Sequence, residues 1–251
     1  MTNMHNVNSD ADLERPLSGQ VALVTGSSRG IGKAIAGKLA QLGAAVSICG
    51  RNPKALEAAA RELDDFPSGI LFRVADVTNS SDVSALVDAT EKKLGPITLL
   101  VNNAGIGNPG FGPVQDKSES DWDLVLSTNL KSVFLVCRAV APLMIQRRRG
   151  DIINISSLAG KNTFAGGGLY CASKWGLQGL SGCMGEDLRA FGIRVSVISP
   201  GSVATEFSGR GPKDPAKVLT PEDVAHAVAM VALQGPQSFI SEVHLRPVSK
   251  P

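Results

Sequence analysis

The order of apolar runs and amphipathic stretches is the feature that most constrains how this chain folds. From residue 19 onward, short runs rich in Val, Ile and Leu alternate with longer stretches of helical periodicity. This alternation is typical of β-α units, which build a parallel sheet covered by helices on both faces. A chain of 251 residues is also the right length for one large domain of this kind. We therefore expect an α/β fold with a doubly wound, parallel, seven-stranded sheet.

The predicted elements follow this alternation. The seven strands are expected at Gln20–Thr25, Ala45–Gly50, Ile70–Ala75, Ile97–Val101, Asp151–Ile155, Arg194–Ser199 and Ser238–Val243. Helices are expected at Gly30–Leu42, Pro53–Asp65, Ser80–Leu94, Glu119–Leu130 running into Ser132–Arg149, Leu169–Phe191 and Pro221–Leu233. Gly43, Gly95, Gly150 and Gly192 each follow a predicted helix, where a positive φ closes the last turn. The stretch Glu206–Leu219 lacks a pattern, and we interpret it as a mobile loop.

Composition and charge exclude several classes of protein. The formal charge of +2 is too small to make nucleic acid or an anionic membrane the main partner. Arg147–Arg149 form the one dense basic run, which we interpret as a helix end that is capped by Gly150. Residues 1–18 are predicted to be a disordered polar tail that precedes a single domain at 19–251. We expect neither a signal peptide nor an apolar run of about 18 residues.

The four cysteines are scattered along the chain at positions 49, 137, 171 and 183. They form no Cys-x-x-Cys motif, and no histidine lies at a metal-ligand spacing from them. We therefore expect no metal site and no disulfide framework, and a reduced, cytoplasmic location.

A glycine-rich turn, Thr25–Gly32, joins the first predicted strand to the first helix. Gly26 permits a tight turn, Gly30 lets the backbone approach a pyrophosphate, and Gly32 lets the helix pack close to the sheet. Free N–H groups at the start of the helix face the anion. The turn between strand and helix therefore predicts a dinucleotide site. A plain glycine-rich turn is the alternative.

The spacing of these glycines, Thr-Gly-x-x-x-Gly-Ile-Gly, resembles the short-chain dehydrogenase/reductase family, which has a Rossmann-type fold. The other motifs that carry the resemblance are Asp76, Asn102–Gly105, Asn129, Ser157, Tyr170-x-x-x-Lys174 and Pro200-Gly201. Together they cover nearly everything after the tail. For the cofactor, the resemblance implies contacts from Gly26, Ser28, Arg29, Gly30, Ile31, Gly32, Asp76, Val77, Asn103, Ala104, Gly105, Tyr170, Lys174, Pro200, Gly201, Val203 and Thr205.

The end of the second strand indicates which dinucleotide binds. A carboxylate there would hydrogen-bond the ribose 2′-hydroxyl and repel a 2′-phosphate. This strand instead ends Cys49-Gly50-Arg51, and Arg51 can form charge-assisted bonds to a phosphate. Arg29 is a second cation on the same side of the turn. We predict NADP(H); the alternative is that both arginines are only solvated.

Tyr170 is the only tyrosine in the chain, and Lys174 lies four residues later, on the same face of a helix. The resemblance implies that Ser157, Tyr170, Lys174 and Asn129 form a catalytic tetrad. Tyr170 would exchange a proton, Ser157 would hydrogen-bond the substrate carbonyl, and Asn129 would hold a water that links Lys174 to solvent. Ser156 is the fallback for Ser157.

The proton transfer requires a phenol that is more acidic than usual. An unperturbed phenol has a pKa near ~10, and lowering it to about 7 requires roughly 4 kcal/mol. A lysine charge at ~4 Å supplies on the order of 4 kcal/mol when the effective dielectric constant is near 20. Oxidised nicotinamide would add positive charge in the same place, whereas burial without either charge shifts the pKa upward.

The sequence as a whole looks like β-ketoacyl-acyl-carrier-protein reductases and their relatives. We expect reversible, NADPH-dependent reduction of a ketone or aldehyde, with a 3-oxoacyl thioester as the first substrate to consider. A homodimer or homotetramer is expected by family analogy, through the helices at Ser132–Arg149 and Leu169–Phe191. A non-catalytic NADP-binding regulator or scaffold is the alternative. The end of the chain lacks the family's Gly-rich segment, and His244 is expected to lie beyond the last strand.

Overall fold

The computed structural model of this chain describes residues 15–109, 112–208, 214 and 217–249. It contains one seven-stranded sheet in the order β3-β2-β1-β4-β5-β6-β7, and every neighbouring pair is parallel. The strands are β1 (Val21–Val24), β2 (Ala45–Gly50), β3 (Ile70–Val74), β4 (Leu99–Asn102), β5 (Gly150–Ile155), β6 (Ile193–Pro200) and β7 (Glu242–Leu245). The doubly wound α/β fold expected from the sequence is confirmed.

The strand order reverses between β1 and β4. The first three strands proceed from β1 toward β3, and the chain then returns to β4 on the other side of β1 and continues to β7. In an open parallel sheet this reversal leaves a crevice at the carboxyl ends of the strands, where ligands bind. The topology therefore places the ends of β1, β4 and β5 around one crevice.

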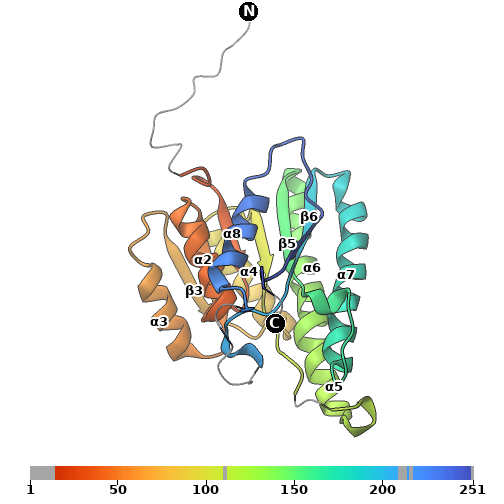
Figure 1. Cartoon of the computed structure of the whole chain (residues 1–251). Helices are drawn as coiled ribbons and strands as arrows, with labels where there is room; N and C mark the ends of the chain where they lie inside the picture. The colour runs from red at the N-terminus through yellow and green to blue at the C-terminus, as the bar shows by residue number, and fades with distance from the viewer. Residues whose placement is uncertain (1–14, 110–111, 209–213, 215–216, 250–251) are drawn as a thin grey trace, which may run out of the picture.

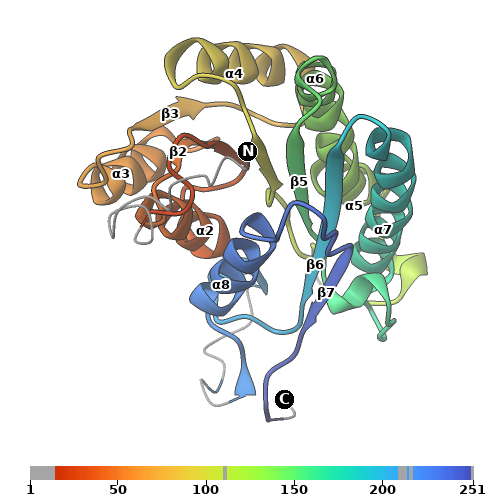
Figure 2. The same cartoon turned by 90° about the horizontal axis from the view of Figure 1, so that it is seen from above.

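Helices cover both faces of the sheet, as Figure 2 shows. The helices are α2 (Gly30–Gln41), α3 (Pro53–Leu63), α4 (Ser80–Lys93), α5 (Glu119–Leu126), α6 (Ser132–Arg147), α7 (Gly168–Arg189) and α8 (Pro221–Ala232). One hydrophobic core lies between the sheet and α2, α3 and α8, and a second lies between the sheet and α4, α6 and α7. Strands buried on both faces explain the almost purely apolar runs in the sequence.

Local sequence signals set several helix starts. Asn52 accepts a hydrogen bond from the backbone N–H of Ala55 at the start of α3, and Asn79 caps α4 in the same way. At α8, Thr220 and Asp223 form a reciprocal capping box. Each cap satisfies backbone N–H groups that the first helical turn leaves without a partner.

Two sequence-based expectations at element ends are wrong. The last strand was expected at Ser238–Val243, but β7 begins at Glu242 and includes His244, because Val197–Pro200 of β6 pair with residues 242–245. Gly150 does not cap α6. Arg148 adopts the left-handed conformation at that position, with φ +52°, and Gly150 begins β5.

The helical stretch from Glu119 to Arg147 is continuous, with a π-helical turn at Ser127–Lys131 between α5 and α6. By length and composition it could cross a membrane, so the expectation that the chain has no such segment is wrong. Half of its most apolar window is buried inside the protein, where α6 packs against the sheet and α4. Core packing therefore accounts for its apolar composition.

The predicted tail and loop lie partly outside the described residues. Residues 15–18 form a turn at the start of the described chain (Figure 1). Leu17 in this turn is 3% exposed and its N–H donates to the carbonyl of Leu42, so ordered structure begins before residue 19. Within the stretch predicted as a loop, Glu206–Ser208 form a short 3-10 turn and Leu219 pairs with Val203.

Candidate functional site

A cavity of about 990 Å³ opens at the carboxyl ends of the strands, where the sheet topology predicts a crevice. It runs from the ends of β2 and β3, past the glycine-rich turn after β1, to the ends of β5, β6 and β7. All of the predicted site residues except Asn129 line this cavity. The fold therefore brings the glycine-rich turn and the Ser-Tyr-Lys set into one pocket.

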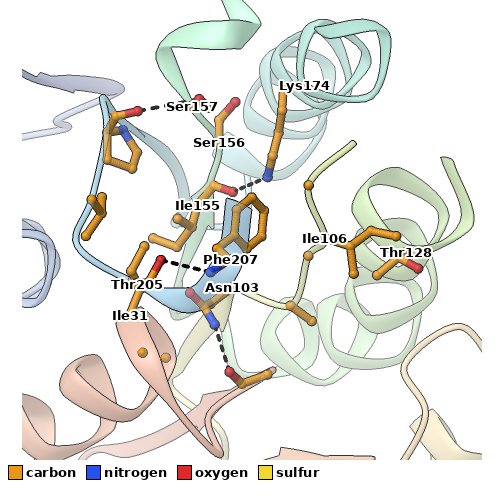
Figure 3. A pocket seen from close by; sticks show the side chains of 18 of the residues that line it. Ile31, Asn103, Ile106, Thr128, Ile155, Ser156, Ser157, Lys174, Thr205 and Phe207 are labelled. Carbon is orange, nitrogen blue, oxygen red and sulfur yellow. Dashed lines mark hydrogen bonds between the residues drawn. The ribbon is translucent and has the colours of Figure 1, made fainter. Parts of the chain in front are cut away.

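The glycines of the turn are required by its geometry. Gly26 and Gly30 have positive φ values of +63° and +54°, and a Cβ on Gly26 would lie 2.8 Å from the Cα of Ala104. A Cβ on Gly32 would overlap the carbonyl oxygen of Gly26 and the side-chain nitrogen of Asn103. That nitrogen donates to the carbonyls of Thr25 and Gly26, so Asn103 fixes the turn against β4 (Figure 3).

The start of α2 is free of protein caps. Arg29 is the N-cap residue but makes no side-chain capping bond, and the first turn contains no acidic residue. The backbone N–H groups that a helix start leaves without a partner thus face the pocket together with the positive end of the helix dipole. Such a cradle fits an anion, and a pyrophosphate is the anion that this turn geometry accommodates. Ser28 and Ile31 lie on either side of Gly30 and line the same cradle.

Charged side chains line the pocket around the glycine-rich turn and beyond the ends of β2 and β3. Arg29 is exposed and forms a salt bridge of 2.9 Å with Glu206. Arg51, also exposed, makes no salt bridge to any described residue, and its charge acts on Asp76. Burial opposes ionisation of Asp76, but hydrogen bonds from Thr78 and the charge of Arg51 outweigh it and lower the pKa of this carboxyl. Asp76 and its neighbour Val77 both line the pocket.

Ser157, Tyr170 and Lys174 meet at the ends of β5 and the start of α7. Tyr170 and Lys174 lie one turn apart on α7, and the Lys174 ammonium is 5.9 Å from the centre of the Tyr170 ring. Lys174 is 4% exposed and donates to the carbonyl oxygen of Ile155 at 2.9 Å (Figure 3). Ser157 lies two residues beyond the end of β5, and its hydroxyl acts on the Tyr170 phenol and lowers its pKa. The predicted proximity of these three side chains is thus found in the structure.

Burial dominates the pKa values of this pair. Burial raises the pKa of Tyr170 to about 12, against the smaller lowering by its hydrogen bond with Ser157. Burial also lowers the pKa of Lys174 to about 8, because a charged group is less stable away from water. In the protein chain itself burial has the larger effect on the Tyr170 phenol, and its acidification by Lys174 together with the nicotinamide stays a prediction.

Asn129 lies in the π-helical turn, behind the pocket wall. Its side chain exchanges two hydrogen bonds with the backbone of Ile106, at 2.7 and 2.9 Å, and donates to Ser173. It therefore joins the segment after β4 to α7, and its role as the holder of a water stays a prediction. Ser156, the fallback for Ser157, is buried and its Oγ accepts a hydrogen bond from Gln178.

The segment after β6 closes the pocket opposite the glycine turn. The residues of this segment that line the pocket include Pro200, Gly201, Val203 and Thr205. Thr205 lies near the glycine turn: a Cβ added to Gly30 would be 3.5 Å from the Thr205 methyl group. Ser157 Oγ lies 3.5 Å from the Pro200 carbonyl, which ties this segment to the end of β5.

Several pocket residues were not predicted from the sequence. Phe207 packs edge-on against Tyr170, with ring centres 6.0 Å apart, and Asn108 accepts a hydrogen bond from the Tyr170 backbone N–H. Phe164 and Arg246 also line the pocket. None of them lies in a motif, and only the departure of the chain end from the family pattern pointed toward the region of Arg246. Among the described residues there is no cluster of His, Cys, Asp and Glu side chains that could hold a metal ion.

Comparison with known proteins agrees with this geometry. The family model for short chain dehydrogenases matches residues 20–215. A 3-oxoacyl-[acyl-carrier-protein] reductase of Chlamydia muridarum is 38% identical over 228 residues, which cover 86% of this chain and 91% of that protein.

Solved structures show the same fold. A metagenomic short-chain oxidoreductase in complex with NADP is 44% identical, with a TM-score of 0.81 over 92% of this chain and 99% of that one. An actinorhodin polyketide ketoreductase variant with NADPH is 29% identical, with a TM-score of 0.84 over 91% of this chain and 96% of that one. The sequence motifs, the sheet topology and these matches lead to one conclusion: the chain is an oxidoreductase that belongs to the short-chain dehydrogenase family.

Proposed function

We propose that the chain is an NADPH-dependent carbonyl reductase that also catalyses the reverse alcohol oxidation. The observation that carries this proposal is the single pocket in which Ser157, Tyr170 and Lys174 lie beside the glycine-rich turn. We name two parts of this pocket. The cofactor half consists of Gly26–Gly32, Arg51, Asp76, Val77 and Asn103–Gly105. The substrate half consists of Ser157, Phe164, Tyr170, Phe207 and Arg246.

NADP(H) is the cofactor that best fits the cofactor half. The open start of α2 would hold the pyrophosphate, and Arg51 with Arg29 would bind the 2′-phosphate. Asp76 and Val77 would contact the adenine, and Asn103–Gly105 the adenosine ribose. Pro200, Gly201, Val203 and Thr205 would hold the nicotinamide. Two related structures contain NADP or NADPH, which supports the same choice.

The dinucleotide, when bound, would supply or accept the hydride, and side chains of this protein would donate or accept the proton. Tyr170, with a pKa of about 12, is protonated at neutral pH and ready to donate to a developing alkoxide, which is a stronger base than phenolate. Ser157 would hydrogen-bond the same oxygen and orient the carbonyl. Lys174, with a pKa of about 8, is mostly charged at neutral pH and would stabilise the phenolate that remains. Asn129 would hold the water that returns a proton through Lys174.

The finer identity of the substrate is also a proposal. The similarity to the Chlamydia muridarum enzyme makes a 3-oxoacyl thioester the first compound to test. We further propose a cytoplasmic homodimer or homotetramer that associates through α6 and α7. Phe134 on α6 and Trp175 on α7 support this, because both are large apolar side chains about half exposed on the described surface.

The test is an NADPH-oxidation screen over ketones, aldehydes, quinones and acetoacetyl thioesters, with Tyr170→Phe as the matched variant. We expect turnover by the parent and a loss of roughly 10²- to 10⁴-fold in the variant, the usual contribution of a general acid. NADPH binding, measured by fluorescence, should change less than about 3-fold, since the phenol ring remains. If NADPH binds but no carbonyl is reduced, or if the variant matches the parent, the proposal fails.

A further inference from the structure

Among the described residues, four cations line the pocket, and three of them have a function in the proposed cofactor and proton chemistry. Arg29 pairs with Glu206, Arg51 acts on Asp76, and Lys174 donates to Ile155. The fourth is Arg246, which is exposed and makes no hydrogen bond or ion pair with any described residue. An arginine that faces a pocket without a partner has its full hydrogen-bonding capacity left for a ligand.

The sheet places Arg246 far from the cofactor cations. Arg29 follows β1, whereas Arg246 follows β7, four strands away and thus roughly 19 Å across the sheet. Ser157 follows β5, which leaves about 10 Å between the ends of β5 and β7. Gly201 donates to the carbonyl of Leu245, and a Cβ on Gly201 would lie 3.3 Å from both Leu158 and Pro247. Arg246 therefore follows a strand that lies beyond β5 as counted from the strands that carry Arg29 and Arg51.

The carboxylates of the neighbourhood are already paired. Glu242, on β7, forms ion pairs with Lys161 at 3.1 Å and with His244 at 3.0 Å. Burial opposes its ionisation, but these two partners outweigh that effect and lower the pKa of Glu242. In the described lining of the pocket, the carboxylates are Asp76 and Glu206, and both face cations of the cofactor half. The charge of Arg246 is thus not neutralised within the described part of the chain.

Apolar aromatic side chains line the same pocket as this cation. Phe207 and Phe164 both line the pocket and are 45% and 47% exposed, and Phe207 contacts Tyr170 directly. Half-exposed aromatic rings in a pocket offer apolar area to a ligand. The lining thus combines aromatic rings, one of them in contact with Tyr170, with a guanidinium that has no partner among the described residues.

We propose that Arg246 is a specificity-determining residue that binds an anionic group of the substrate. The substrate class is an oxo compound with an apolar body and an acidic group several bonds from the carbonyl. The anion is the carboxylate of a free oxo acid or a phosphate of a carrier thioester, and both suit a guanidinium fork. This inference rests on the proposed function and identifies the substrate class for the same site.

The test uses two substrate pairs and the chain saturated with NADP⁺. The first pair is 4-oxo-4-phenylbutanoate and its methyl ester; the second is acetoacetyl-coenzyme A and acetoacetyl-N-acetylcysteamine, which lacks the phosphates. Binding is measured by calorimetry, which does not depend on turnover, and kcat/KM is measured with NADPH. The variants are Arg246→Ala and Arg246→Gln, with Arg61→Ala on α3 as a matched control far from the pocket.

We expect Arg246→Ala to lower the affinity and kcat/KM for the charged member of one pair by about 10- to 100-fold, the usual loss for a hydrogen-bonded charge. For the neutral member of that pair, both should fall by less than about 2-fold. The affected pair identifies the source of the anion. Equal losses within each pair, or no loss in either, would overturn the inference even if carbonyls are reduced. Conversely, if Tyr170→Phe reduces carbonyl substrates as fast as the parent does, the proposed function fails. The calorimetric comparison of Arg246→Ala with the parent still decides the inference about Arg246, because it does not depend on turnover.

Discussion

The cofactor half of the pocket is shaped mainly by the backbone and its immediate neighbours, whereas the substrate half depends on side chains from distant segments. In the cofactor half, Gly26 and Gly32 leave room that a Cβ would fill, and Asn103 ties the turn to β4. In the substrate half, Phe207 from the segment after β6 meets Tyr170 on α7. The cofactor half therefore restricts which residues fit in it, and we expect the side chains of the substrate half to set specificity.

The sharpest test of the backbone-defined half is Gly32→Ala. The added methyl would overlap the Gly26 carbonyl and the Asn103 amide, so the turn must move. We expect NADPH affinity, measured by fluorescence titration, to fall by about 100-fold, in keeping with an overpacking cost of about 1–3 kcal/mol.

Gly179→Ala is the matched control, because Gly179 lies within α7 and an added Cβ there meets nothing within 4 Å. Its NADPH affinity should equal that of the parent, and its free energy of unfolding should rise by about 0.5–1 kcal/mol. Parent-like NADPH binding by Gly32→Ala would show that the turn is not the cofactor cradle.

Arg51→Ala tests the charge preference of the same half. Loss of a charge-assisted bond to the 2′-phosphate should lower the affinity for NADPH by roughly 10- to 100-fold and the affinity for NADH by less than about 2-fold. Arg29→Ala should have a smaller effect, since Arg29 is paired with Glu206. Equal losses of affinity for the two dinucleotides would show that Arg51 does not bind the 2′-phosphate.

Next to the substrate half, Lys174 lies one helical turn from Tyr170, and we expect the pH dependence of reduction to report on its charge. Its pKa of about 8 means that the charge is present below that pH and is lost above it. We expect kcat for reduction to be flat near pH 7 and to fall by up to about tenfold per pH unit above pH 8. In Lys174→Arg, which stays charged, the fall should disappear from this range; an unchanged profile would exclude Lys174 as its cause.

The same group affects stability with a definite sign. Unfolded Lys174 has a pKa near 10.5 and holds its proton between pH 8 and 10.5, whereas the folded state releases it. The contribution of Lys174 to the free energy of unfolding therefore rises with pH across that window, by on the order of 3 kcal/mol. Chemical denaturation of the parent and of Lys174→Met should show this rise only in the parent, and identical pH slopes would refute it.

The sequence predicted more of the cofactor half than of the substrate half, for a physical reason. Glycine spacing and strand-helix alternation are local signals, so Thr25–Gly32 and all seven strands could be predicted, with β7 displaced by four residues at its start. Phe164, Phe207 and Arg246 enter the pocket only through tertiary packing, which no local pattern reports. The extent to which burial raises the pKa of Tyr170 is likewise set by the whole fold and not by a local pattern.

The most direct test of the central claim is a crystal structure of the chain with NADP⁺ bound. Reacting atoms in a productive complex lie about 3–3.5 Å apart. The account therefore predicts the nicotinamide ring in the pocket beside Ser157, with its C4 atom within roughly 5 Å of the Tyr170 hydroxyl. A dinucleotide whose nicotinamide lies away from Tyr170 would contradict the account.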